Sequence, residues 1–385
     1  MTNTRKPLIM VCLLATISAI LHFGNANQVR GDPKLDFDSP FYVHLLLWLR
    51  GEVDAPPPQP FRMRIVMPAA ANTLSSYIGV NNAFGLTNSV LWITTVTLYF
   101  LSIKKLYDLK TATIVSILFS FSVPVMVYGA AISTDMLSYL TIAASILYLA
   151  TDQKQKTKSL LLLGVLLYFT TMGREVSILG IAYIFVYRIL NDKNLYQALK
   201  ETLILFIFAT GGLATSSILV PEPGYTSYFY QALQSSLAID KVLKELYQII
   251  AAYHIGWILI VYTTINISKS AKGRDNLFLS SLIVGGGFIV LDHFIGIISS
   301  RFVFLTYPGF LVAIYKGAES IGDSIRSKTK SNLYQTITWT ALILYITVGF
   351  LATAENNISF PTSSDRDISK LFPNNYPLEK LWHME

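Results

Sequence analysis

The chain has a single cysteine and few charged residues. Because one thiol cannot form a disulfide within the chain, Cys12 contributes no cross-link and does not indicate the redox compartment. Charged residues make up only 14% of the sequence, whereas apolar residues make up 52%, and this balance excludes an ordinary soluble domain. Histidine is also scarce. None lies at metal-ligand spacing from His293, so the sequence predicts no transition metal.

Apolar runs of about the 20 residues needed to cross a bilayer recur along the chain, with aromatic residues at many of their ends. We expect a first span over 7–23 and further spans over 84–103, 111–131, 134–150, 159–172, 176–190, 201–220, 246–266, 277–293, 300–316 and 334–353. Two alternatives stay open: the first span is a secretory signal cleaved near 24–26, or 159–190 is one long broken helix. The sequence predicts an all-α, polytopic membrane bundle with about eleven transmembrane helices.

The lysines and arginines indicate the orientation of this bundle. If the N-terminus is cytoplasmic, the inner connections hold basic clusters at 104–110, 154–158, 269–274 and 326–330. The outer connections then collect most of the acids, as the positive-inside rule requires. This orientation explains the net charge of +7 without a nucleic-acid partner. We assign 1–353 to a multi-pass domain in the plasma membrane and 354–385 to a short extracytoplasmic C-terminal tail.

The apolar segment 65–80 contains Pro68 and Asn72, and a span at this place would invert every later connection. We therefore expect an interfacial or re-entrant helix at the outer face. The stretch 44–48 is a second candidate for an interfacial helix.

Ionisable residues at the ends of the predicted spans share one side of the membrane. In this topology the outer side holds Asp36, Asp38, Arg62, Arg64, Asp135, Arg174, Glu175, Asp292, His293 and Arg301. Charges at a membrane edge are costly and usually face a cavity, so their common side predicts one site. Two structural readings stay open: the first-loop acids form a solvated face, or Asp135 and Glu175 simply pair with Arg174 inside the bundle.

Four short motifs follow one another along the chain. They are Asp38 with Tyr42 and Pro60-Phe61-Arg62-Met63-Arg64, then Ser133-Thr134-Asp135, then Gly173-Arg174-Glu175, and then Ser300-Arg301-Phe302 with Pro308. This series resembles the C-type superfamily of membrane glycosyltransferases, which use polyprenyl-phosphate sugars as donors. Bacterial members often carry PFRYR where this chain has Met63 in place of the tyrosine. The resemblance spans most of residues 1–316 and implies a helical membrane transferase.

Sugar transfer from a lipid phosphate requires a base for the acceptor hydroxyl and cations for the departing phosphate. Asp38 is the first candidate for the catalytic base and Asp36 the second. In the superfamily the catalytic acid often has another acid beside it, whereas Phe37 separates the two acids here, so the choice between them stays open. We expect the donor phosphate to be bound by Arg64, Arg62, Arg174, Arg301 and His293. We expect the substrates to contact Tyr42, Asp135, Glu175 and Tyr228. No cofactor is expected, and the question of a divalent metal stays open.

These expectations predict a hexosyl- or pentosyltransferase with an extracytoplasmic active site. Its partners are a polyprenyl-phosphate-linked sugar donor, a glycan, lipid or protein acceptor, and membrane lipids. A transporter or lipid flippase is the first alternative, although it favours matching halves with helices broken near the midplane. A surface-polysaccharide ligase or polymerase is the second. Such enzymes tend to place arginine and histidine in a large late outer loop, and the connection 221–245 contains neither.

Overall fold

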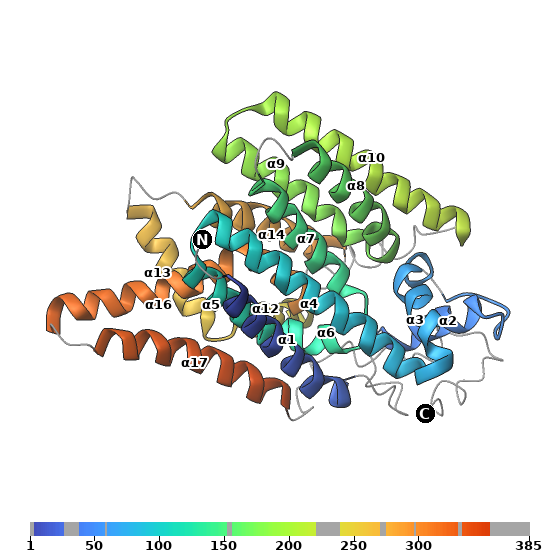
Figure 1. Cartoon of the computed structure of the whole chain (residues 1–385), viewed down its shortest axis with the longest axis horizontal. Coiled ribbons are helices and arrows are strands. Elements are labelled where there is room, and N and C mark those ends of the chain that lie inside the picture. The colour runs from blue at the N-terminus through green and yellow to red at the C-terminus, as the bar shows by residue number, and fades with distance from the viewer. Residues whose placement is uncertain are drawn as a thin grey trace.

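The computed structural model describes residues 4–26, 38–57, 60–151, 156–220, 239–269, 275–295, 298–329 and 333–354. Every regular element in these ranges is a helix (Figure 1), so the predicted all-α class is confirmed. Asp36, Tyr228 and residues 355–385 lie outside the described residues. The assignment of 354–385 to a tail therefore stays a prediction.

The first helices are α1 (Arg5–Ala26), α2 (Ser39–Leu49), the 3-10 turn η1 (Phe61–Met63), α3 (Val66–Ile78) and α4 (Val80–Leu106). Between α3 and α4, Gly79 has φ of 80°, a conformation that glycine adopts at little cost. This turn lets α3 pack against α4 instead of continuing it. In Figure 1, α2 and α3 lie together at one end of the bundle. Helices thus occur at both predicted interfacial segments, while their depth in a bilayer stays a prediction.

The middle helices are α5 (Leu109–Ser120), α6 (Val123–Ala130), α7 (Asp135–Leu149), α8 (Lys156–Gly173), the 3-10 turn η3 (Glu175–Ile178), α9 (Leu179–Asn191) and α10 (Leu195–Leu219). Asp108 caps α5, because its carboxylate accepts a hydrogen bond from the backbone N–H of Thr111 at 2.8 Å. Pro124 lies in the first turn of α6, where its missing N–H is harmless. The chain bends by 55° between α5 and α6, so the predicted span 111–131 is broken.

The region 159–190 forms two helices, not one long broken helix. Lys156 begins α8 and Arg188 lies near the end of α9, yet both pair with Glu201, at 2.7 Å and 3.1 Å. The two helices are therefore antiparallel, and the chain reverses at Arg174, whose backbone is extended.

The last helices are α12 (Ile239–Tyr253), α13 (Gly256–Lys269), α14 (Asn276–Ile295), α15 (Ser300–Val303), the 3-10 turn η4 (Phe304–Thr306), α16 (Tyr307–Thr329) and α17 (Leu333–Ala354). The chain bends by 82° between α12 and α13. His254 lies at this bend with φ of 38°, in the left-handed region that favours glycine. The predicted span 246–266 therefore contains a sharp corner.

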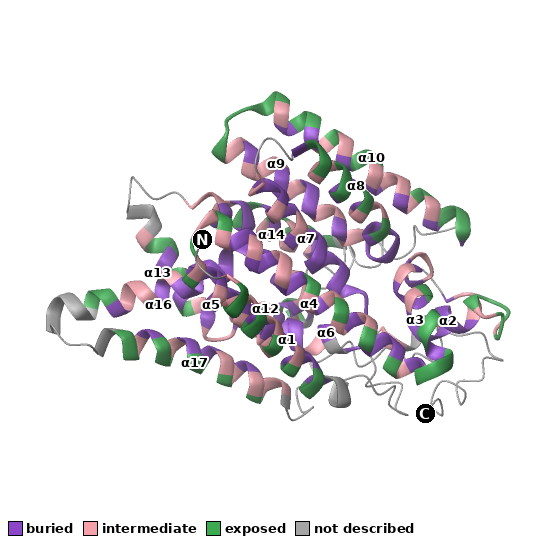
Figure 2. Ribbon diagram, viewed as in Figure 1, coloured by how far each residue is buried: buried purple, intermediate pink, exposed green. Residues whose placement is uncertain are grey.

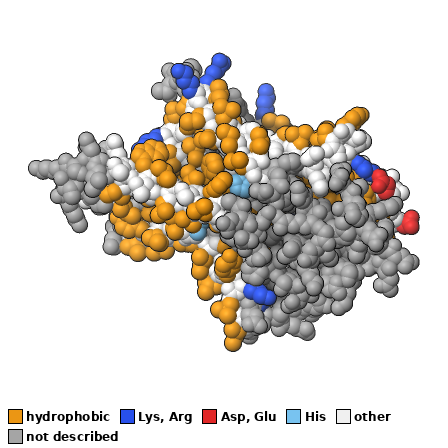
Figure 3. All heavy atoms as spheres, turned by 90° about the horizontal axis from the view of Figure 1, so that it is seen from below, with side chains coloured by type: hydrophobic (Ala, Val, Ile, Leu, Met, Phe, Trp, Pro, Cys, Tyr) orange, Lys and Arg blue, Asp and Glu red, His pale blue; other side chains and the backbone are white. Residues whose placement is uncertain are grey.

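Five described helices are long and apolar enough to cross a membrane, and two bent pairs raise this number to seven. The protein is thus a multi-pass membrane protein, while the count of about eleven spans stays a prediction. Exposed residues lie on the outward faces of peripheral helices such as α10 and α17 (Figure 2). On the face shown in Figure 3, most described side chains are hydrophobic and few are charged.

Ion pairs at one end of the bundle join connections that the predicted topology places on the same side. Asp275 accepts a hydrogen bond from the Tyr107 hydroxyl at 2.6 Å and pairs with Lys316 at 2.8 Å. Lys110 pairs with Glu319 at 2.7 Å. These contacts agree with the predicted sidedness of the helix ends, and which end faces the cytoplasm stays a prediction.

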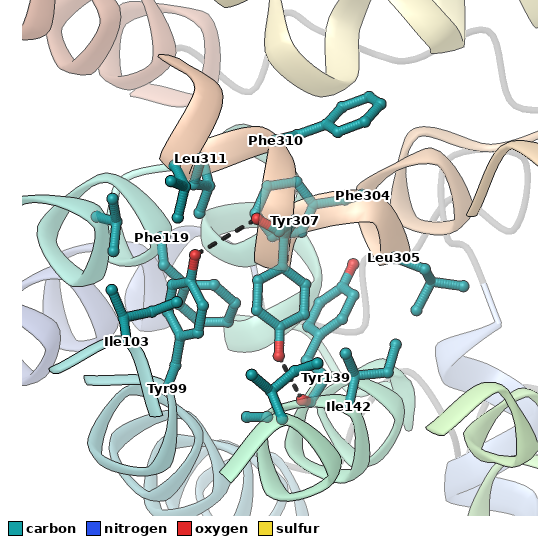
Figure 4. Close-up of a cluster of buried hydrophobic side chains, with 14 of the residues drawn as sticks. Tyr99, Ile103, Phe119, Tyr139, Ile142, Phe304, Leu305, Tyr307, Phe310 and Leu311 are labelled. Carbon is teal, nitrogen blue, oxygen red and sulfur yellow. Dashed lines mark hydrogen bonds between the residues drawn. The ribbon is translucent and has the colours of Figure 1, made fainter. Parts of the chain in front are cut away.

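A layer of aromatic rings packs in the core of the bundle (Figure 4). The ring of Tyr307 lies 4.9 Å from that of Phe119 and 5.6 Å from that of Phe304, centre to centre. The Tyr307 hydroxyl donates to the carbonyl oxygen of Tyr139 at 2.9 Å, and the Tyr99 hydroxyl donates to that of Pro308 at 3.0 Å. Each buried hydroxyl thus has an acceptor, which removes the cost of burying a phenol.

Candidate active site

Asp38 precedes α2, at the end of the bundle where α2 and α3 lie. Its side chain does not cap that helix. Instead, Oδ2 of Asp38 accepts a hydrogen bond from Nη1 of Arg301 at 3.0 Å. The neighbouring Ser39 donates to the carbonyl oxygen of Ile132 at 3.1 Å and holds this turn against the segment before α7. The Asp38 carboxylate is therefore bound by a distant part of the chain and not by its own helix.

Asp135, the first residue of α7, joins two arginines. Its Oδ2 lies 3.2 Å from the same Nη1 of Arg301, and its Oδ1 lies 2.8 Å from Nη2 of Arg174. The side chains of Asp135 and Arg174 are only 5% and 1% exposed. Charges removed from water to this degree are stable only when they are paired, so each depends on the other.

Tyr42 and Arg64 extend these contacts to Glu175. The Tyr42 hydroxyl accepts hydrogen bonds from Nη1 of Arg64 at 2.9 Å and from Nη1 of Arg174 at 3.5 Å. Arg64 also binds both oxygens of Glu175, with its Nε 3.0 Å from Oε2. We call the connected set the arginine network. Its members are Asp38, Tyr42, Arg64, Asp135, Arg174, Glu175 and Arg301, and its three guanidinium groups balance its three carboxylates.

Aromatic rings line the network. Phe302 lies beneath two guanidinium groups, with its ring centre 5.3 Å from Cζ of Arg174 and 5.1 Å from Cζ of Arg301. The ring of Tyr128 is 5.3 Å from Cζ of Arg301, and that of Phe61 is 5.4 Å from Cζ of Arg64. Cation–π contacts of this kind stabilise desolvated arginines and fix the planes of their guanidinium groups.

The arginines depress the pKa values of two carboxylates. Burial raises the pKa of Asp38, but the charge of Arg301, followed by those of Arg64 and Arg174, lowers it below its usual 3.8. Burial also raises the pKa of Glu175. The charge and the hydrogen bonds of Arg64 outweigh this effect and lower the pKa from 4.5 to about 2. Both groups are therefore ionised at neutral pH. Each becomes a stronger base if its arginine moves away.

The structure brings together Asp38, Tyr42, Arg64, Asp135, Arg174, Glu175 and Arg301, all of which the sequence singles out. Their predicted roles stay predictions. Arg62 lies on η1 and is not a member of the network as defined above. Asp36 and Tyr228 lie outside the described residues.

His293 has a different environment from the one expected. Its Nδ1 lies 2.6 Å from Oε2 of Glu245 on α12, and its carbonyl oxygen accepts a hydrogen bond from Lys241 at 2.6 Å. The contacts of this histidine thus lead to α12. Its role as a phosphate ligand stays a prediction.

Three residues around the network were given no role in the sequence analysis, although Thr134 and Phe302 belong to two of its motifs. Thr134 shares a hydrogen bond of 3.1 Å with the Tyr42 hydroxyl. Its position beside Asp135 was the feature of the sequence that could have indicated a place in the site. Phe302, next to Arg301, carried a similar signal. Tyr128 lies within an apolar run and carried none, because its ring meets Arg301 only in the folded chain.

The described residues contain no group of three or more histidine, cysteine or acidic side chains placed to hold a metal ion. The expectation that the protein uses no transition metal stays a prediction, and the question of a divalent metal stays open. A cavity of about 300 Å³ lies at the opposite end of the bundle, lined in part by Tyr107, Asp275 and Lys316. It is remote from the arginine network, whose own geometry is the stronger indication of a site.

The fold is similar to that of solved structures from the C-type superfamily of polytopic membrane glycosyltransferases. The resemblance predicted from the sequence is thus confirmed at the level of the fold.

Two solved structures represent this class. The oligosaccharyltransferase AglB from Archaeoglobus fulgidus, in complex with an inhibitory peptide and a dolichol-phosphate, has a TM-score of 0.57 and 11% identity, over 92% of this chain and 56% of its own. ArnT from Cupriavidus metallidurans in the apo state has a TM-score of 0.50 and 11% identity, over 92% of this chain and 73% of its own. The chain therefore spans about half the length of AglB, and the likeness shows the fold alone. No protein-family profile and no curated protein matches the sequence.

Proposed function

We propose that the protein is an integral membrane glycosyltransferase that moves a sugar from a polyprenyl-phosphate carrier to an acceptor at the extracytoplasmic face. Asp38 is the general base. One observation carries the proposal: Arg64, Arg174 and Arg301 come from separate parts of the chain and meet in one network with the carboxylates. The dolichol-phosphate bound to AglB supports a lipid phosphate as the ligand of these arginines.

The network has unused capacity to bind a phosphate. Nε of Arg174 and Nε of Arg301 are buried and donate no hydrogen bond within the described part of the chain, and phosphate oxygens suit guanidinium donors. Arg301 is the most exposed of the three arginines, at 16% against 1% for Arg174 and 7% for Arg64. We therefore expect Arg301 to exchange Asp38 for the donor phosphate.

In the transfer step, Asp38 receives the proton of the acceptor, and the arginines stabilise the charge of the departing phosphate. The acceptor hydroxyl gives its proton to the Asp38 carboxylate while its oxygen forms a bond to the anomeric carbon of the sugar. The bond from that carbon to the phosphate oxygen breaks, and its electrons stay on the phosphate, which gains one negative charge. Arg301 and Arg174 stabilise this charge. Because Arg301 has left Asp38, the pKa of Asp38 rises when it must accept the proton.

The test is transfer of label from a set of polyprenyl-phosphate hexoses and pentoses, in membranes that contain the wild-type chain or Asp38→Asn. We expect label on a glycan, lipid or protein acceptor with the wild type only, in the presence or absence of EDTA. Labelled substrate that crosses the membrane chemically unchanged would indicate a transporter or flippase. Transfer from pyrophosphate-linked glycans alone would indicate a ligase or polymerase. Either result overturns the proposal.

A further inference from the structure

α12 is amphipathic in the opposite sense to a surface helix of a soluble protein. Its inward face carries Lys241, Glu245 and Gln248, which are 8%, 3% and 7% exposed. Its outward face is apolar and is between 42% and 59% exposed at Val242, Leu243, Leu246, Tyr247 and Ile250. The spacing of the polar residues places them on one helical face. Since this face is buried, its polar atoms require partners inside the bundle.

Those partners belong to the backbone that leads into Arg301. Oε1 of Glu245 accepts a hydrogen bond from the N–H of Ile298 at 3.2 Å, and Oε1 of Gln248 accepts one from the N–H of Ser300 at 2.9 Å. The first N–H groups of a helix have no acceptor within it. α12 supplies acceptors to the segment at the start of α15.

Two further contacts join α12 to His293 near the end of α14. Its Oε2 lies 2.6 Å from Nδ1 of His293, and Lys241 donates to the carbonyl oxygen of His293 at 2.6 Å. The end of α14 and the start of α15 are thus bound to the same face of α12. From the other side, the Tyr139 hydroxyl donates to the carbonyl oxygen of Arg301 at 3.1 Å.

We infer that Glu245 and Gln248 are positioning residues for Arg301. They act through the backbone of 298–300 and set how far the guanidinium group reaches toward Asp38 and Asp135. The inference rests on the proposed function for its kinetic consequences. The apolar side of α12 faces outward, while its polar side contacts the backbone that leads into Arg301. A displacement of α12 would move the arginine with it.

The kinetic test removes one acceptor at a time. Gln248→Met keeps the length of the side chain but not its oxygen, whereas Gln248→Glu keeps an acceptor oxygen. Leu243→Ala is the control on the outward face of the same helix. We expect Gln248→Met to raise the donor KM roughly tenfold with the acceptor KM unchanged. Gln248→Glu should recover most of the loss, and Leu243→Ala should resemble the wild type.

A double variant separates positioning from general stability. Because Gln248 acts through Arg301, adding Gln248→Met to Arg301→Lys should cost little beyond Arg301→Lys alone. If the fold-loss of transfer in the double variant equals the product of the losses in the two single variants, the inference is overturned.

Hydrogen exchange tests the same contacts without any assay of activity. We expect faster exchange in the segment 298–303 for Gln248→Met and Glu245→Ala than for the wild type or Leu243→Ala. If the wild type transfers no sugar but exchange still accelerates, the proposed function fails and the anchoring by α12 stands. Unchanged exchange in both variants overturns the anchoring itself.

Discussion

The carboxylates of Asp38 and Asp135 bind the same guanidinium nitrogen, at 3.0 Å and 3.2 Å. That nitrogen is Nη1 of Arg301, which is also the most accessible guanidinium of the arginine network. Two carboxylates at such short range repel each other, so the cation between them stabilises both ionised forms. Arg301 is thus the residue whose movement changes the charge balance of the site most directly.

Asp38→Asn should reduce transfer by about 10²- to 10⁴-fold, because the acceptor proton loses its base. Binding of polyprenyl phosphate should be retained, since Arg301 no longer has Asp38 as a competing partner. Initial rates and lipid-phosphate binding in nanodiscs measure the two effects. Glu52→Gln is the control, because Glu52 is an exposed acid of the same loop and pairs only with Arg50 among the ion pairs described. Loss of transfer in Asp36→Asn but not in Asp38→Asn would assign the base to Asp36.

Arg301→Gln should change the pH dependence of whatever transfer remains. In the wild type the pKa of Asp38 lies below 3.8, so the carboxylate stays ionised, and able to act as a base, until the pH falls below that value. Removal of the Arg301 charge raises this pKa. The acid limb of kcat/KM should therefore move to higher pH. A profile that keeps the wild-type limb would show that Arg301 does not control the ionisation of Asp38.

Gly212→Ala should destabilise the bundle where α8 and α10 pack. A Cβ at Gly212 would lie 2.2 Å from the carbonyl oxygen of Tyr168 and 2.4 Å from Oγ1 of Thr171, and close helix contacts in membranes depend on small residues. We expect a loss of about 1–3 kcal/mol, visible as a lower Tm in detergent. Gly286→Ala is the matched control, because a Cβ there meets nothing within 4 Å. Equal Tm values for the two variants would contradict the packing argument.

Cysteine labelling should place the two charged ends of the bundle on opposite sides of the membrane. Cys12→Ser provides a background without thiols. In this cysteine-free background, Glu52→Cys should react with an impermeant maleimide added outside intact cells. Lys110→Cys should react only after the membrane is permeabilised. Both side chains are more than half exposed, at 51% and 63%. Reaction of both from the same side would refute the topology. Protection of Glu52→Cys from the external reagent would remove the active site from the outer face.

The sequence predicted much of the network because its charged members stand out against apolar runs. Asp135, Arg174 and Arg301 lie at the ends of such runs, where an ionisable group is costly and therefore conspicuous. The partner of each one could not be read from the sequence, since it depends on how the helices pack. Glu175, for example, binds Arg64 and not the adjacent Arg174.

The corners of the fold and the role of α12 were less accessible to prediction. The sequence around His254 gives no sign of a left-handed residue, so the 82° bend inside the span predicted at 246–266 was missed. Periodicity shows that α12 has a polar face, but the side that turns inward depends on whether water or lipid lies outside. For this reason Glu245 was assigned no role beyond its place at the end of the connection 221–245, although it binds the backbone before Arg301.

The aromatic layer has an electrical consequence. The hydroxyls of Tyr99 and Tyr307 donate to backbone carbonyls, and a hydroxyl bound in this way does not relay protons across the bundle. In the proposed transfer, we therefore expect the proton released by the acceptor to leave on the side where the reaction occurs. Moving one charge through the bilayer would add about 2.3 kcal/mol per 100 mV of membrane potential. In proteoliposomes under potassium diffusion potentials of either sign, turnover should accordingly be insensitive to voltage.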